Sequence, residues 1–129
     1  MYNRSGIKSV SGAATTQILA NVELQASAGC IVAQAVGTNV GGKKIAKAGT
    51  PIVVDFNNLQ TPAVAPNPQA SPATVANAVL LHDVDVTAGN ANGTALYFGV
   101  VNINRLEDDV KSKVTAGVNT IGAITFIKA

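Results

Sequence analysis

Apolar runs separated by short segments rich in glycine and asparagine give the chain a strand-like pattern, clearest in its second half. Four runs have the length and the β-branched content of strands: residues 51–56, 78–86, 95–103 and 121–127. The segment 87–94, TAGNANGT, is rich in residues that accept positive φ, and its Asn92-Gly93 pair signals a tight turn. We therefore predict that residues 78–86 and 95–103 form an antiparallel hairpin.

One segment has a helical pattern instead. Its apolar residues recur at i, i+4 and i+8, at Leu106, Val110 and Val114. Asn104 can cap this segment, and Glu107 follows three residues later, as in a capping box. The acidic run that starts at Glu107 is then expected in a solvated first turn, near the positive end of the helix dipole. We predict one short helix at about residues 105–114.

The other segments predict an arm, a loop and less regular strands. Residues 1–12 are polar and small, so we expect an N-terminal arm that is extended or disordered in the free protein. Residues 22–36 hold no helical period and favour a pair of short strands, while residues 37–42 favour a flexible turn. Residues 57–75 contain four of the five prolines and predict a long irregular loop. The expected fold is mainly β, with a small barrel-like domain over residues 13–129.

The composition indicates a hydrophobic core built mainly from small side chains. Of the 129 residues, 47% are hydrophobic but only 4% are aromatic, and tryptophan is absent. Small side chains bury less area each, at roughly 25 cal/mol per Å² of apolar surface. Stability is therefore expected to depend partly on association with other subunits.

Charge is sparse, and this argues against two classes of partner. Charged residues make up 12% of the chain, about half the usual share, and the formal net charge is +2. Lys43, Lys44 and Lys47 form the densest basic group, too small for the basic face that nucleic acid requires. No run approaches the roughly 18 apolar residues of a membrane helix. We expect a protein that contacts other proteins, with neither nucleic acid nor membrane as a partner.

Residues 37–43 resemble a phosphate-binding loop but lack two of its parts. The glycines and the lysine have the right spacing, whereas Lys44 stands where the motif needs Ser or Thr to hold magnesium. Gly49 and Pro51 follow too soon for the helix whose N-terminus would cradle a phosphate. We predict a turn here.

His82, Asp83 and Asp85 offer an imidazole and two carboxylates within one predicted strand. Alternate residues of a strand share a face, so the two carboxylates lie together and His82 points the other way. Such a split disfavours a metal site or acid–base pair. Cys30 is the only cysteine, which excludes an intrachain disulfide, and it is more often a small buried residue than a nucleophile. We expect no enzyme activity, no metal and no cofactor.

The order of the segments resembles that of the head decoration proteins of tailed bacteriophages, the lambda type in particular. Those proteins have a stretch of Ala, Thr and Pro that runs into an apolar strand ending in Asp, as in AGTPIVVD at residues 48–55. An apolar strand, an aromatic-glycine strand, a short acidic helical segment and a closing strand follow in order, at residues 78–81, 96–99, 105–110 and 120–127. Relatives from phages of Gram-positive hosts are more similar still, with a pattern close to LLHDVDVT and FGVVNINRL within residues 80–106.

The resemblance implies a β-tulip fold that forms homotrimers without catalysis. It also implies that trimers bind the major capsid protein on the outer surface of the expanded head, at three-fold and quasi-three-fold positions, and stabilise the shell. The protein would be made in the host cytoplasm and reside on the virion. In this family an N-terminal arm often adds a strand to an edge of the capsid protein, a mode that needs an extended segment. The expected capsid contacts of this chain are Tyr2, Arg4, Ile7 and Val10.

Two other interpretations stay open. The HDVDV-type strand is shared by base domains of capsid fibres and other virion attachment proteins, which normally continue into a stalk. A small ligand-binding β-domain or enzyme is the third possibility, and a metal or nucleotide bound in native mass spectrometry would favour it. A trimer of about 39 kDa, three times the chain mass of 13.0 kDa, would favour the decoration protein.

Overall fold

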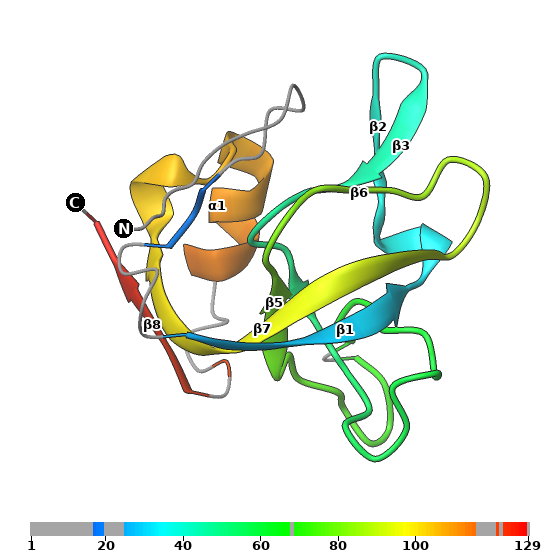
Figure 1. The fold of residues 1–129 in the computed structure, drawn as a ribbon, viewed down its shortest axis with the longest axis horizontal. Helices are drawn as coiled ribbons and strands as arrows, with labels where there is room; N and C mark the ends of the chain where they lie inside the picture. Colours follow the sequence, from blue (N-terminus) through cyan, green and yellow to red (C-terminus); the bar gives the residue numbers. More distant parts are fainter. Residues whose placement is uncertain (1–16, 20–24, 68, 116–120, 122, 129) are drawn as a thin grey trace, which may run out of the picture.

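The computed structural model describes residues 17–19, 25–67, 69–115, 121 and 123–128, and these form two β-sheets and one α-helix (Figure 1). The fold is mainly β, with 43% strand and 13% helix, which confirms the predicted fold class. The arm predicted at residues 1–12, with its four contact residues, lies outside the described residues.

The larger sheet has the strand order β1-β7-β5-β4, and β8 pairs with β7 beyond this path. Its strands are β1 Ala26–Val32, β4 Pro51–Ile52, β5 Ala78–Leu80, β7 Ala91–Asn102 and β8 Ala123–Ile127. The smaller sheet, in the order β2-β3-β6, consists of β2 Thr38–Val40, β3 Lys43–Ala46 and β6 Val84–Asp85. All pairings are antiparallel except β7 with β8, which is parallel. The helical elements are η1 Gln34–Val36, η2 Ile103–Arg105 and α1 Asp108–Thr115.

Two hydrophobic cores flank the larger sheet. The helix-side core holds the apolar face of α1 together with Val79, Leu81 and Leu96. The sheet-side core holds Ala78, Leu80 and Ala95, packed against residues of the smaller sheet such as Val84. Successive residues of β5 therefore serve opposite cores, as strand alternation requires. A strand buried on both faces reads as a continuous apolar run, which explains AVLL at residues 78–81.

A β-bulge at Tyr97 divides β7 into two parts. Ser27 of β1 pairs with Leu96 and the next partner pair is Ala26 with Phe98, so Tyr97 is the extra residue. The insertion reverses the alternation along β7. Leu96 and Val101 both reach the helix-side core although they are separated by an odd number of positions.

The strand predicted at residues 78–86 is broken, which corrects the prediction of one continuous strand. Its first part is β5, whose Val79 pairs with Leu96 of β7, so the pairing of the predicted hairpin is confirmed. Its second part is β6, which belongs to the smaller sheet. Between them Asp83 accepts a hydrogen bond from the Ala48 amide (2.7 Å), which ties the bend to the segment after β3.

The turn predicted at residues 87–94 is shorter than expected. β7 already begins at Ala91, and Gly93 pairs with Cys30 in the middle of the ladder with β1. A Cβ atom at Gly93 would lie 2.7 Å from Val32 Cγ2 and 2.9 Å from Val84 Cγ2. Glycine is therefore required here by close packing in the sheet-side core, and the tight-turn interpretation of Asn92-Gly93 is wrong.

The helix begins later than predicted. Asn104 lies in the 3-10 turn η2, and α1 starts at Asp108, with the Lys111 amide donating to the Glu107 carbonyl. The predicted capping box is therefore wrong. The predicted apolar face is confirmed, because all three of its members are buried in the helix-side core: Leu106, Val110 and Val114.

Three further predictions of extent need correction. The described part of residues 22–36 holds one strand, β1, paired with the distant β7 and not a pair of local strands. Residues 37–42 are not only a turn, because β2 lies within them and Gly41-Gly42 alone connect it to β3. The strand predicted at residues 51–56 is limited to β4. The irregular loop at residues 57–75 is present, and isolated bridges at Ala63 and Val64 hold it to the sheets.

Candidate interaction surface

The segment that resembles a phosphate-binding loop is the β2–β3 hairpin. Gly41 and Gly42 have φ of 56° and 84°, the left-handed values that a tight hairpin turn needs. The chain then continues as a strand, so no helix N-terminus is available to bind a phosphate at this loop. The turn predicted within residues 37–43 is present only at Gly41-Gly42, as the tip of a β-hairpin.

The two carboxylates of the His82 segment each accept a hydrogen bond from a backbone amide. Asp83 Oδ1 accepts the Ala48 amide at 2.7 Å, and Asp85 Oδ1 accepts the Thr87 amide at 2.9 Å. Hydrogen bonds from the Thr87 side chain and backbone lower the pKa of Asp85. His82 Nδ1 is buried and has no hydrogen-bond partner among the described residues. Within the described part of the chain, no three His, Cys, Asp or Glu side chains are grouped so that they could hold a metal ion.

Cys30 is a core residue. It is 6% exposed and belongs to the sheet-side core. Burial raises the pKa of its thiol, which disfavours the thiolate that nucleophilic attack requires. The prediction that Cys30 packs as a small apolar residue is confirmed.

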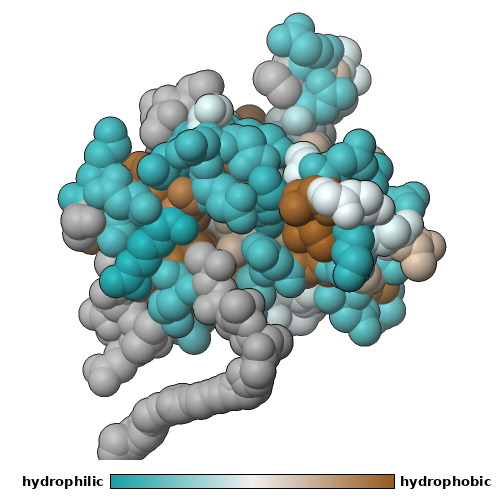
Figure 2. Space-filling model, turned by 90° about the horizontal axis from the view of Figure 1, so that it is seen from above, coloured by the Kyte–Doolittle hydropathy of each residue, from teal (hydrophilic) through white to brown (hydrophobic). Residues whose placement is uncertain are grey.

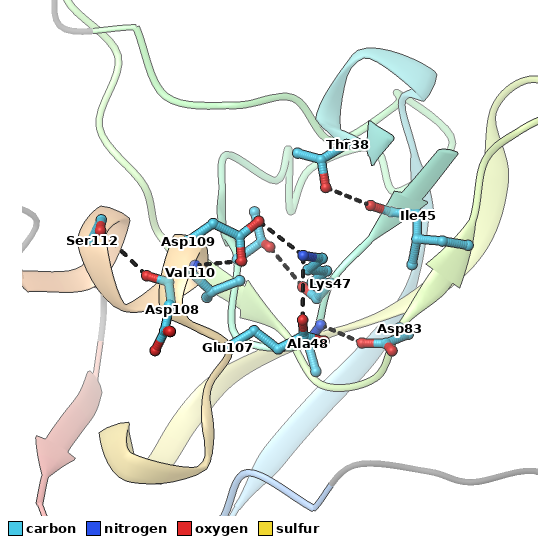
Figure 3. Close-up of polar contacts among 11 residues, drawn as sticks. Thr38, Ile45, Lys47, Ala48, Asp83, Glu107, Asp108, Asp109, Val110 and Ser112 are labelled. Carbon is cyan, nitrogen blue, oxygen red and sulfur yellow. Dashed lines mark hydrogen bonds and ion pairs between the residues drawn. The ribbon is translucent and has the colours of Figure 1, made fainter. Parts of the chain in front are cut away.

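An ion pair joins the segment after β3 to the start of α1 (Figure 3). Lys47 Nζ lies 3.0 Å from Asp109 Oδ2 and 3.3 Å from Glu107 Oε1. The hydrogen bond with Asp109 is the main cause that raises the pKa of Lys47, and the same bond lowers the pKa of Asp109. The acidic run is solvated at the start of α1, as predicted, and the structure adds that two of its members pair with Lys47.

The outer side of the β7–β8 pair is apolar and exposed. Residues paired across adjacent strands point to the same face of a sheet. Phe98 pairs with Ala123, Val100 with Thr125 and Asn102 with Ile127, while Ile124 and Phe126 turn inward to the helix-side core. We define the β7–β8 face by its five members: Phe98, Val100, Ala123, Thr125 and Ile127. Phe98 is 48% exposed and Ile127 is 36% exposed, and the face carries no charge.

A second exposed apolar area lies beside the bulge. The Phe56 and Tyr97 rings meet edge to face, with centroids 5.3 Å apart and an interplanar angle of 71°. Both side chains remain partly exposed, and the proline-rich loop (residues 57–75) has two more exposed apolar side chains, Val64 and Val75. Figure 2 shows one side of the molecule, on which hydrophilic side chains cover most of the surface and hydrophobic ones gather in separate areas.

No protein-family model, curated protein or solved structure matches this chain. Among the described residues, none of the helices has the length and apolar character needed to cross a membrane.

A shallow groove of about 510 Å³ lies between α1, β4, η1 and the proline-rich loop. Val36, Pro51 and Pro66 form apolar walls, and Lys113 stands at its margin. The Thr50 hydroxyl in the groove donates to the Lys47 carbonyl at 2.6 Å. This bond lies within the turn that precedes β4 and uses the hydroxyl hydrogen, so Thr50 adds little polarity to a groove whose described lining is mostly apolar.

Sequence reasoning placed the candidate site in the N-terminal arm and missed the β7–β8 face. The sequence did contain a sign of this face, because residues 95–103 and 121–127 carry no charge at either set of alternate positions. A strand with one solvated face normally alternates apolar and polar residues. Lack of that alternation indicated two buried faces, and in the described structure of the single chain one of the two faces is exposed.

Proposed function

We propose that this protein is a capsid decoration protein of a tailed bacteriophage, which binds the outer surface of the expanded head as homotrimers and stabilises the shell without catalysis. The observation that supports it best is the exposed, uncharged β7–β8 face on a domain with two cores. Contiguous exposed apolar surface marks sites of protein association. The order of the sequence segments, which resembles that of decoration proteins, supplies the kind of association.

Under this proposal the contacts with the major capsid protein and with neighbouring copies are mainly apolar and backbone contacts. The β7–β8 face and the Phe56–Tyr97 pair both offer exposed apolar side chains for contacts with neighbouring copies and with a shell. Residues Tyr2, Arg4, Ile7 and Val10 contribute an arm that reaches the shell. Many weak contacts add up in a trimer, because each copy raises the effective concentration of the others.

The test is to add purified protein to expanded phage heads that lack it and to image the heads by electron microscopy. We expect trimeric density at the three-fold and quasi-three-fold positions, retained when the salt concentration is raised, because apolar contacts are not screened by salt. Absence of density at those positions would refute the proposal. A chain without residues 1–12 serves as a control for the arm, and it is expected to bind more weakly.

A further inference from the structure

The outer edge of β8 has backbone groups that nothing in the described structure uses. β8 pairs with β7 on one side only. The Ile124 amide donates to the Ile121 carbonyl at 3.0 Å, so the amide of Ile124 points away from β7. Alternate residues of a strand direct their backbone groups to the same edge. The N–H and C=O of Phe126 therefore also point outward, and no described residue bonds to them.

Ile121 forms a β-bridge with Ile124 at the start of this edge, and beyond that bridge β8 lacks the features that normally prevent strand addition. Proteins protect edge strands with charged side chains, prolines or bulges. β8, AITFI, contains none of these residues, and its pairing with β7 runs over five residues without a shift in register. Its inward side chains are fixed in the helix-side core, so the edge is held in an extended form ready to pair. In Figure 1, β8 (red) lies at the margin of the molecule beside β7.

The surroundings of the edge indicate which segment fits. On the β7–β8 face, every second side chain of an added strand would lie beside Ala123, Thr125 and Ile127 of β8, a surface without charge. Lys128 follows β8 directly, is exposed, and forms no ion pair with any described residue. A carboxylate at the matching end of the added strand would pair with it.

We infer that the outer edge of β8 binds an extended, otherwise uncharged segment of another protein, which adds a strand to the sheet and places a carboxylate beside Lys128. A second copy of β8 does not fit as well, because residues 123–128 contain no acidic side chain to pair with Lys128. A helical partner does not fit either, since its backbone groups are already bonded and cannot satisfy Phe126. The inference holds whether or not the partner belongs to a viral shell.

The test uses the isotope-labelled full chain and a blocked synthetic hexapeptide in which valine and threonine alternate before a terminal glutamate. We expect saturable shifts in the amide resonances of Phe126 and Lys128. Two further peptides carry N-methyl groups on alternate residues. In one peptide these groups lie along one edge of the extended strand, and in the other they lie along the opposite edge. Only one edge of an added strand faces β8, so one N-methylated peptide should bind like the parent and the other about tenfold more weakly, as expected for loss of one or two hydrogen bonds.

Side-chain controls separate strand addition from general adhesion. Ile127→Lys places a charge on the β7–β8 face and should lower the affinity for the parent peptide. Asn39→Lys, on the exposed strand β2, should leave that affinity unchanged. Replacing the peptide glutamate with lysine should weaken binding about threefold to fivefold, as expected for an exposed ion pair. Absence of shifts at Phe126, or equal binding of the two N-methylated peptides, would overturn the inference. Since no phage head is used, these outcomes are independent of the test of the proposed function.

Discussion

The two parts of β7 on either side of Tyr97 differ in what surrounds them. Before the bulge, β7 lies between β1 and β5 and contributes Ala95 and Leu96 to opposite cores. After the bulge it pairs with β8, and only one of its faces is buried, while Phe98 on the other remains 48% exposed. Both parts are equally free of charge. An uncharged strand therefore has two uses in this protein, to fill a core and to offer a surface, and the bulge separates them.

Truncation in the first part of β7 should have the largest effect on stability. Leu96 is fully buried, so Leu96→Ala is expected to lower the free energy of unfolding by about 2–5 kcal/mol. Val100→Ala, in the half-buried second part, should cost less than about 1.5 kcal/mol, because its environment is partly solvent. Chemical denaturation of both variants measures the difference. Equal losses would show that the two parts are not distinct.

Adding volume in the first part of β7 should have the next largest effect on stability. Gly93→Ala forces a methyl group against Val32 and Val84, and overpacking of this kind costs about 1–3 kcal/mol. Gly29 on the neighbouring strand β1 has no atom within 4 Å of an added Cβ, so Gly29→Ala is the matched control and should change stability little. The comparison is made by thermal denaturation. A destabilised Gly29→Ala variant with an unaffected Gly93→Ala variant would contradict the packing described for the sheet-side core.

The ion pair between Lys47 and the start of α1 should contribute less to stability. Asp109→Asn removes the 3.0 Å contact with Lys47, and since Asp109 is 43% exposed we expect a loss of at most about 1 kcal/mol at neutral pH. The lowered pKa of Asp109 means that its contribution is complete above the ordinary value of 3.8 and is lost as pH falls through the lower folded-state value. The raised pKa of Lys47 means that the contribution is also lost when pH rises through a value above 10.5.

The pH dependence is checked by comparing the unfolding of wild type and Asp109→Asn between acidic and alkaline pH. The difference between them should be greatest near neutrality and should disappear at both extremes. A difference that is constant across this range would show that the variant acts through packing of α1 and not through its charge.

The smallest effect on stability is expected on the β7–β8 face. Ile127→Lys exposes its charge to solvent, so the free energy of unfolding should change by less than about 0.5 kcal/mol. Association should suffer most from the same change, because it places a charge on an apolar contact surface. Unfolding experiments and binding to expanded heads give the two readouts. A variant that binds heads as wild type does would remove the β7–β8 face from the proposed interface and leave the fold unaffected.

Local patterns in the sequence predicted the types of most elements. Leu106, Val110 and Val114 identified the buried face of the helix, and the apolar runs identified β4, β5, β7 and β8, because these periods depend only on backbone geometry. Positions that depend on distant residues were missed. Asn92-Gly93 has the local chemistry of a turn, yet its place is decided by Val32 and Val84 in space. The helix start moved because the 3-10 turn η2 takes up Asn104.

The sequence by itself determined a mainly β domain with small core side chains, little charge, one short helix and a buried cysteine. These properties follow from composition and periodicity, which act residue by residue. Only the tertiary structure decided that residues 78–86 divide between two sheets, that Tyr97 forms a bulge, and that β8 pairs in parallel with β7, with no described strand on its outer side. An apolar strand looks the same in sequence whether its second face meets a core or solvent. The neighbours that fold against it decide which of these occurs.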